Sequence, residues 1–322
     1  MKFFFAVLRK IGYALLLLVA VLVLNFMLIH IAPGDPVDTL VGEMGGASPE
    51  LIAKLRADYG LDRSLPEQLF TYIVNVAKGN LGMSFTYDQP VISLILDRLP
   101  ATLLLVLSAL VMAVLLGTFL GVVAAQKPRS PFSHFVTILS LAGYSAPVFW
   151  TGMMLLILLS YWVPLFPSFG MSDVGARESS MAYAVDVLRH LILPAVTLAS
   201  IYLAVYSRLA RASMMDVLGS DYIRTARSKG LSERVVVYKH ALKNALLPVV
   251  TMAGLQFSQL IAGAVVVETV FSWPGMGQLA FESILRRDHT LLLGILFFST
   301  VIVVVVNLLT DLTYRLLDPR IK

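Results

Sequence analysis

The segment SDYIRTARSKGLSE, from Ser220 to Glu233, is basic and polar, and it lies between two long apolar runs. Ser220 is a suitable N-cap, and Asp221 would place a negative charge in the first helical turn, where the helix dipole favours it. Gly230 stands where a helix would end, with Lys229 in the last turn. The pattern predicts a helix of two to three turns, held between two longer helices.

One side of this short helix is expected to be apolar and small. Tyr222 and Ala226 are i,i+4 neighbours with Ile223 beside them, and basic residues occupy the remaining surface. A second helix, Ser232 to Ala245, is expected to lead into the next apolar run. Such a helix resembles a knob that fits a groove in a partner protein. The alternative is a basic loop on anionic lipid headgroups, where each Lys or Arg gains about 1 kcal/mol. Capping at both ends and small apolar residues favour docking to a protein.

The rest of the chain has the composition of a membrane protein. Of its 322 residues, 58% are hydrophobic and only 14% are charged, and the mean hydropathy is +0.82. Soluble domains carry about 25% charged residues. The sequence therefore predicts an all-α polytopic membrane protein with six transmembrane helices, because six apolar runs are long enough to cross about 30 Å of hydrocarbon. The runs are Ile11–Ile31, Ala101–Ala125, Val136–Val163, Leu191–Tyr206, Ala245–Val267 and Leu291–Leu312.

Charge predicts the orientation of these helices. With a cytoplasmic N-terminus, the cytoplasmic segments hold 16 of the 25 Lys and Arg residues but only 5 of the 20 acidic residues. The positive-inside rule therefore favours an N-in, C-in arrangement. The expected domains are a first transmembrane helix at 1–31, an extracytoplasmic segment at 32–100, and a core of five transmembrane helices at 101–322 with a cytoplasmic loop at 207–244. In the outer segment, residues 51–60 and 65–77 are expected to form short amphipathic helices.

Several functional classes are disfavoured by what the sequence lacks. There is no cysteine, which excludes disulfides, thiolate metal sites and cysteine nucleophiles. No pair of the five histidines has helical ligand spacing; a metal site assembled in space stays open, but nothing in the sequence suggests one, and no catalytic residue is predicted. The centres of the apolar runs hold essentially no charged residues of the kind that ion-coupled pumps use, and there is no P-loop for nucleotide phosphates. Energy for uphill transport would therefore come from another subunit. The net charge of +5 fits basic cytoplasmic loops, and no nucleic-acid partner is expected.

The polar residues in and near the apolar runs are expected chiefly to form hydrogen bonds between helices. The alternative is a polar translocation path or outer gate. Its candidates are Tyr144, Ser145, Gln256, Gln259, Trp273 and Pro274. The last two belong to FSWPGMGQL at 271–279, which fits either an interfacial tryptophan before a turn or part of an outer mouth. Prolines in or beside the runs can kink the helices: Pro147, Pro164, Pro194 and Pro248.

The basic segment and its surroundings resemble the permease subunits of binding-protein-dependent ABC importers, in the dipeptide, oligopeptide and nickel branch. That branch carries DYxRTARxKGLSE and then HALxNALLPVVT, and this chain has DYIRTARSKGLSE at 221–233 and HALKNALLPVVT at 240–251. APGDP at 32–36, VETVFSWPGMG at 267–277 and LLDPRIK at 316–322 also agree. The wider family's E-A-A triplet is degraded, because with Gly230 as the anchor only its last alanine matches, at Ala226.

The resemblance implies a type I ABC importer permease fold in the bacterial inner (cytoplasmic) membrane, in contact with membrane lipid. It implies that the chain forms half of a translocation path for a peptide substrate, together with a second homologous permease subunit. It also implies two ATP-binding cassette ATPase subunits that hold ATP and Mg, and an extracytoplasmic substrate-binding protein. Import of nickel chelates or glutathione is the alternative within the branch. A secondary transporter and a non-transporting membrane scaffold are the other classes left open.

The resemblance also implies a role for the short cytoplasmic helix, which in such permeases sits in a cleft of an ATPase and couples ATP-driven closure to the membrane helices. On this sequence Gly230→Asp or Ala226→Arg is then expected to uncouple transport without unfolding the spans. The coupling role falls to Asp221, Tyr222, Ile223, Arg224, Thr225, Ala226, Arg227, Lys229, Gly230 and Leu231.

Overall fold

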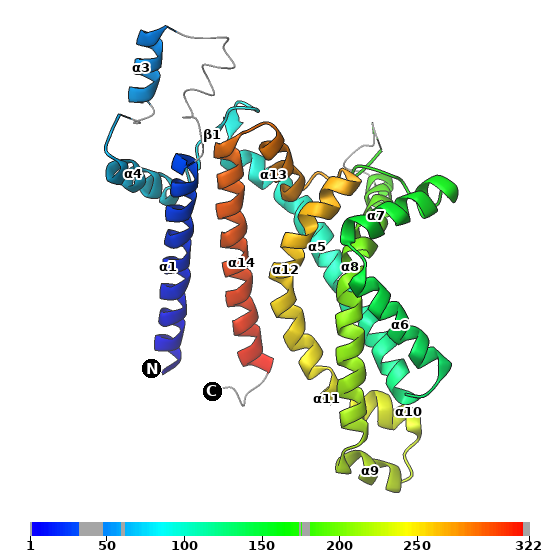
Figure 1. Ribbon diagram of the computed structural model, residues 1–322. Coiled ribbons are helices and arrows are strands. Elements are labelled where there is room, and N and C mark those ends of the chain that lie inside the picture. The colour runs from blue at the N-terminus through cyan, green and yellow to red at the C-terminus, as the bar shows by residue number, and fades with distance from the viewer. Residues whose placement is uncertain (1, 32–47, 59–61, 174, 176–180, 318–322) are drawn as a thin grey trace. The chain divides into compact units, whose positions relative to one another are not determined.

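The computed structural model describes residues 2–31, 48–58, 62–173, 175 and 181–317, and these residues are mostly helical (Figure 1). Contacts divide the chain into two compact units, Met1–Asp97 with Ala280–Leu308, and Arg98–Leu279 with Leu309–Lys322. The long helices are α1 (Lys2–Ile31), α5 (Val91–Gln126), α8 (Met181–Leu218), α12 (Leu247–Phe271) and α14 (His289–Leu317).

The predicted apolar runs all correspond to helices. Among the described residues, five helices are long and apolar enough to cross a membrane, and the number is six if one bent pair counts as a single span. The bent pair is α6 (Pro131–Ser145) followed by α7 (Val148–Leu156) and the π-helix η1 (Ile157–Trp162). The chain is thus an all-α polytopic membrane protein, and its N-in, C-in orientation stays a prediction.

The third apolar run is not one straight helix. It bends by 108° between α6 and α7. Ala146 is extended there, with φ −78° and ψ 134°, a conformation that the ring of the following proline favours because it disfavours the helical region for the residue before it. Pro147 then stands at the N-cap of α7. The break therefore lies at one of the prolines that the sequence identifies as a possible kink.

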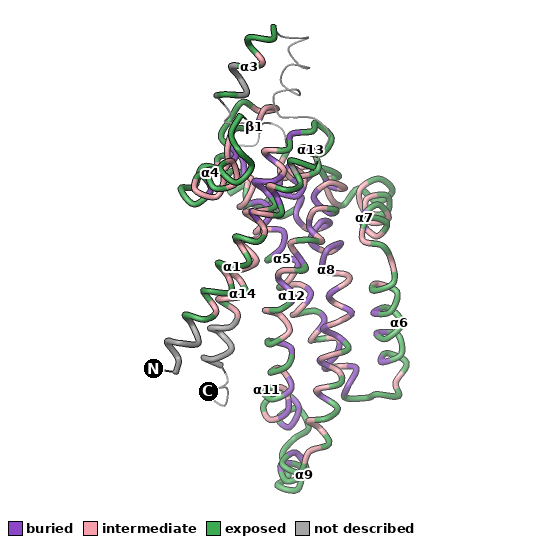
Figure 2. Tube along the Cα trace, turned by 60° about the vertical axis from the view of Figure 1, so that its left-hand side comes forward, coloured by how far each residue is buried: buried purple, intermediate pink, exposed green. Residues whose placement is uncertain are grey.

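In the unit Arg98–Leu279, helix α8 packs against α6, α7 and α12 (Figures 1 and 2). Buried side chains occur along α8 from Val187 to Met214, and the helix continues without a break through Pro194. Helix α6, by contrast, has a largely exposed outer surface (Figure 2). Burial in this unit is thus concentrated on α8, which leads directly into the basic segment.

Helices α5 and α8 approach so closely at Gly121 that no side chain fits there. A Cβ atom on Gly121 would collide with Ser207 O and would lie 2.9 Å from Ala210 Cβ. Only glycine lets the two backbones meet at this distance.

We expect Gly121→Leu to force α5 and α8 apart and to lower the free energy of unfolding by about 1–3 kcal/mol, the usual cost of overpacking. The measurement is the thermal midpoint of the purified chain in detergent. Gly12→Ala is the matched control, because a Cβ on Gly12 meets nothing within 4 Å and alanine favours the helix. Equal midpoints for the two variants would contradict the close packing of α5 on α8.

In the other unit, α1 and α14 are joined by a hydrogen bond from Asn25 Nδ2 to Leu293 O, 3.3 Å long. Helix α4 (Leu65–Ala77) has the bounds that the sequence predicts and contacts α1, where His30 Nε2 and Gln68 Oε1 lie 3.1 Å apart. A short hairpin of β1 (Met83–Ser84) and β2 (Gln89–Pro90) precedes α5.

The predicted helix at residues 51–60 is present as α3 (Pro49–Asp58), although Gly60 lies outside the described residues. The APGDP motif at 32–36 and the residues from Asp318 onward also lie outside them. The proposed division at residues 31 and 100 stays a prediction.

Candidate functional site

The basic segment between α8 and α12 folds into short helical pieces at one end of its unit (Figure 1). Its first helix is α9 (Asp221–Ser228). Ser220, the N-cap residue before it, is extended, and Gly230, which follows the end of the helix, has a φ of +78°. The left-handed φ explains the glycine, because an L side chain is strained there. The predicted short helix is confirmed.

The second predicted helix, Ser232–Ala245, is present but is not uniform. It consists of α10 (Glu233–Val235), the π-helix η2 (Val236–Ala241) and α11 (Leu242–Ala245). The π segment, which the sequence does not signal, lies between α9 and the membrane helix α12. Such π segments inside helices often occur at functional sites.

The small apolar side of α9 packs against the protein's own chain. Ile223 is fully buried and Ala226 is 8% exposed, in a cluster with residues from the end of α5, the end of α8, and η2. The cluster comprises Val122, Ala125, Met214, Ile223, Ala226, Val236, Val237, Ala241 and Ala245. Ala226→Arg would therefore detach α9 from its own support. Coupling by Ile223 and Ala226 stays a prediction, and its physical basis would be the fixing of α9 rather than direct contact with a partner.

Polar contacts also fix the position of α9. Arg227 binds Glu233 through two hydrogen bonds, with Nη2–Oε1 at 2.7 Å and Nε–Oε2 at 3.2 Å. The hydrogen bond to Glu233 raises the pKa of the Arg227 guanidinium. Asn244 Nδ2 donates to the hydroxyl of Tyr222 at 2.7 Å, which ties α9 to α11. Exposed ion pairs add little stability each, so the apolar cluster is the main support.

The outer side of α9 is polar, basic and open. The Arg224 side chain is 73% exposed, and its nearest acidic partner is Asp221, with Nη1–Oδ1 at 3.6 Å. Thr225 and Lys229 are exposed beside it, as are the side chains of Tyr222 and Leu231. The inner side of α9 thus packs against α5, α8 and η2. Its outer side exposes Arg224, with the apolar side chains of Tyr222 and Leu231 at its edge. The coupling role of this outer side stays a prediction.

The candidate path residues do not gather in one place. Tyr144 and Ser145 end α6, where the Arg208 guanidinium lies 5.3 Å from the Tyr144 ring centre. On α12, Gln256 is buried and Gln259 is exposed, although they are only three residues apart. The Gln256 Oε1 atom has no hydrogen-bond partner within the part of the chain that the structure describes. A role for these side chains in a path stays a prediction.

Trp273 and Pro274 belong to a buried junction. Trp273 is fully buried, and its indole nitrogen donates to Ala101 O at 2.9 Å. Pro274 is half-buried beside it. The gate role of both residues stays a prediction, and the observed role of Trp273 is to join the end of α12 to α5.

Sequence reasoning missed Glu268, which organises this junction. Its side chain is fully buried at the end of α12. Oε1 accepts from Thr102 Oγ1 at 2.7 Å, and Oε2 accepts from the backbone nitrogens of Gly277 at 2.6 Å and Gln278 at 3.1 Å. The carboxyl group thus caps the start of α13 (Met276–Leu285). The signal in the sequence is an acid directly after an apolar run and just before a Pro-Gly turn.

Comparisons with known proteins agree with this architecture. A family model described as "Binding-protein-dependent transport system inner membrane component" matches residues 117–322, and the model of the N-terminal part of such membrane components matches residues 1–106. The dipeptide transport system permease protein DppB of Escherichia coli K12 is 41% identical over 98% of both chains. The di/tripeptide transport system permease protein DppB of Pseudomonas aeruginosa is 42% identical over 98% of this chain and 97% of its own.

Solved structures show the same fold at low identity. A chain of the methionine ABC transporter MetNI, in an inward-facing conformation, has a TM-score of 0.55 at 15% identity, over 70% of this chain and 96% of its own. A chain of an amino acid ABC transporter has a TM-score of 0.50 at 17% identity, over 69% of this chain and 94% of its own. The fold is therefore that of ABC-transporter permeases. By its match to the family model over residues 117–322 and its relatives across nearly its whole length, the chain belongs to the family of binding-protein-dependent transport system inner membrane components.

Proposed function

We propose that the chain is the membrane-spanning subunit of an ATP-driven importer, and that it forms half of a path for short peptides. The observation that carries the proposal is the alignment with dipeptide and di/tripeptide permeases over almost the full length of each chain. Lack of a nucleotide-binding P-loop in the sequence fits a subunit that depends on partners for energy.

The proposed assembly contains a second, similar permease, two ATPase subunits that bind ATP and Mg, and an extracytoplasmic binding protein that delivers the peptide. It lies in the bacterial inner membrane. The basic side of α9 is the proposed contact with an ATPase, because it is the exposed side of a rigidly held helix and carries Arg224 and Lys229. Arginine pairs well with carboxylates on a partner surface.

Site-directed crosslinking tests the proposed contact. Because this chain has no native cysteine, an introduced thiol is the only one that it carries. Thr225→Cys places a thiol on the exposed side of α9, and Ala226→Cys places one on the buried side, one position further along. After labelling with a photoreactive maleimide in native membranes, we expect Thr225→Cys to crosslink to an ATPase subunit and Ala226→Cys not to. Crosslinking of Thr225→Cys to lipid alone would favour a membrane-surface loop and would overturn the contact.

The solute is tested separately. The complex that co-purifies with this chain is reconstituted into proteoliposomes with its binding protein, and ATP-dependent uptake of a labelled dipeptide is compared with that of a labelled nickel chelate and of glutathione. Saturable uptake of the dipeptide supports the proposal. Uptake of only one of the other solutes would overturn the peptide assignment while leaving the importer assignment intact.

A further inference from the structure

Helix α6 is too short to cross a membrane by itself, and α7 does not continue in its direction. The helix begins just after α5, whose end belongs to the apolar cluster around α9. Its 15 residues extend about 22 Å, whereas the hydrocarbon core is about 30 Å thick. From a start at the boundary nearest α9, α6 therefore ends about 8 Å short of the opposite boundary. The bend of 108° then directs α7 and η1 sideways rather than onward.

One side of α7 packs against the protein, at the end of the unit opposite α9. Gly152 on α7 is buried, and a Cβ atom there would lie 3.1 Å from Phe271 Cε2 and 3.3 Å from Thr197 Cγ2. The segment after η1 also returns to α12, because the backbone nitrogen of Gly170 donates to Phe271 O at 2.9 Å. Phe271 is the last residue of α12. Both segments are thus fixed at the end of α12 that lies away from α9.

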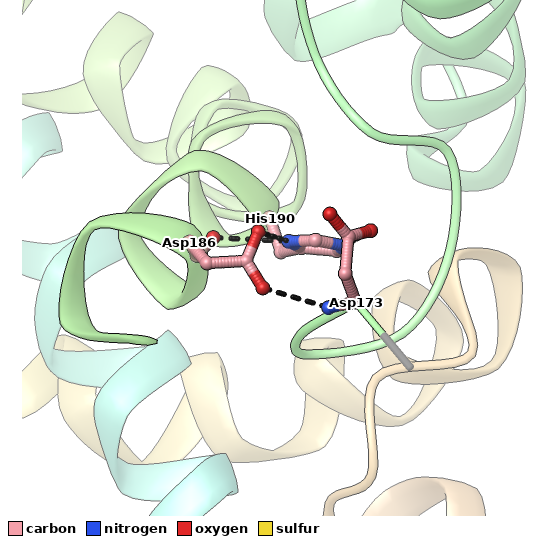
Figure 3. Close-up of side chains that lie close together, drawn as sticks. All are labelled: Asp173, Asp186 and His190. Carbon is pink, nitrogen blue, oxygen red and sulfur yellow. Dashed lines mark hydrogen bonds and ion pairs between the residues drawn. The ribbon is translucent and has the colours of Figure 1, made fainter. Parts of the chain in front are cut away.

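A polar cluster at the start of α8 marks the water side of this end (Figure 3). The Asp173 side chain is 81% exposed, and its backbone nitrogen donates to Asp186 Oδ2 at 2.7 Å. The His190 ring lies between the two carboxylates, with Nε2 3.8 Å from Asp173 Oδ1 and Nδ1 3.3 Å from Asp186 Oδ1. An exposed carboxylate is stable in water and costly in hydrocarbon. Because Asp173 follows Phe169 by only four positions, the segment before it lies near the water boundary.

The remaining surface of α7, η1 and the segment after them is apolar and rich in aromatic rings. Tyr161 is 80% exposed and Trp162 is 68% exposed. No Asp, Glu, Lys, Arg or His occurs from residue 135 to residue 172, so this surface offers a protein partner no charge to pair with. Tryptophan and tyrosine gather at membrane interfaces, because their rings are apolar and their N–H and O–H groups reach water. The exposed aromatic side chains are Phe149, Trp150, Tyr161, Trp162 and Phe169.

We propose that α7 and η1 lie along the plane of the membrane, in its interface opposite the α9 segment, with Trp150, Tyr161 and Trp162 at the level of the lipid headgroups. Segments that lie in this plane are buried about 5–10 Å below the headgroups, which agrees with the depth at which α6 ends. The surface also continues the exposed apolar side of α6, which carries Phe135 and Ile138. The third apolar run then crosses the membrane only through α6, and its second half anchors the unit in the interface.

Two other arrangements compete with this one. Helix α7 and η1 could lie deep in the hydrocarbon as the second half of a broken span, or another subunit could cover their aromatic surface. The interfacial position depends on neither the proposed solute nor the proposed ATPase contact, so it stands or falls separately from them.

Tryptophan quenching measures the depth directly, because the chain has three tryptophans and the third, Trp273, is fully buried. The full chain, with any subunits that co-purify, is reconstituted into phosphatidylcholine vesicles that carry a nitroxide either on the headgroup or deep on the acyl chain. The difference between wild type and Trp150→Phe, or Trp162→Phe, isolates the emission of each exposed tryptophan. We expect stronger quenching by the headgroup nitroxide for both, at a depth of about 10–15 Å from the bilayer centre, since the hydrocarbon core is about 30 Å thick.

A third substitution calibrates the depth. Ile138 is the central residue of α6 and is exposed, so Ile138→Trp in a chain that also carries Trp150→Phe and Trp162→Phe is expected to be quenched more strongly by the deep nitroxide. Equal helical circular dichroism verifies that the variants are folded. Stronger quenching of Trp150 and Trp162 by the deep nitroxide would place α7 and η1 in the hydrocarbon core. Lack of quenching by either nitroxide would show that protein covers them or that they lie in water, and each of these results would overturn the interfacial position.

Discussion

Arg224→Glu is expected to reduce ATP-driven peptide uptake about tenfold or more while the chain reaches the membrane in normal amounts. Arg224 is largely exposed, and its pairing with Asp221 across 3.6 Å adds little stability, so the variant chain should fold normally. A reversed charge in an interface costs several kcal/mol, and each 1.4 kcal/mol is about a factor of ten in affinity. The measurements are uptake into proteoliposomes and the amount of ATPase that co-purifies with the chain.

Arg63→Glu is the matched control for this charge reversal. Arg63 is also exposed but precedes α4, on the segment predicted to be extracytoplasmic, and its replacement is expected to leave co-purification of the ATPases unchanged. Normal uptake and normal ATPase recovery with Arg224→Glu would show that the outer side of α9 makes no essential contact.

Glu268→Leu is expected to cause the largest loss of stability, on the order of 3 kcal/mol or more in the free energy of unfolding. The change leaves the backbone nitrogens of Gly277 and Gln278 and the hydroxyl of Thr102 without their acceptor. Each buried polar group left unpaired costs about 1–3 kcal/mol. The thermal midpoint in detergent and the level of chain in the membrane measure the effect.

Two further substitutions make the Glu268 result specific. Glu268→Gln keeps one acceptor oxygen and is expected to lose less stability than Glu268→Leu. Glu50→Leu changes an exposed glutamate on α3 and is expected to stay within about 0.5 kcal/mol of the wild type. If Glu268→Leu melted at the wild-type temperature, the hydrogen-bonded junction between α12 and α13 would not support the fold.

Sequence alone predicts the elements whose signals are local. The apolar runs gave the membrane helices because length and hydropathy suffice to identify them. Ser220 and Gly230 correctly bracket α9, since capping and left-handed backbone preferences act within a few residues. The bend at Pro147 also follows a local rule, although its angle of 108° depends on packing that no local pattern encodes.

Periodicity could not predict which side of α9 is exposed. The spacing of Ile223 and Ala226 shows that one side is apolar, but it does not say what covers that side. In the structure the cover is the chain's own cluster around Met214 and Val236, which places the arginine side outward. Mutations aimed at contact with a partner should therefore change Arg224 rather than Ala226.

Features built from distant parts of the sequence were also missed. The cap on α13 joins Thr102 to Glu268, which are 166 positions apart. The cluster at the start of α8 brings Asp173 to the pair Asp186 and His190, and only the pair has a helical spacing. Histidine positions compared only with other histidines could not reveal a cluster that mixes imidazole with carboxylates.

The central claim is that this chain is a gate driven by other subunits. Its most direct test is the accumulation of a labelled dipeptide in proteoliposomes that contain the purified chain alone, compared with proteoliposomes that contain the complete co-purified complex, each in the presence of the binding protein and with and without ATP. We predict accumulation against the gradient only for the complete complex with ATP. Accumulation by the chain alone would contradict the account.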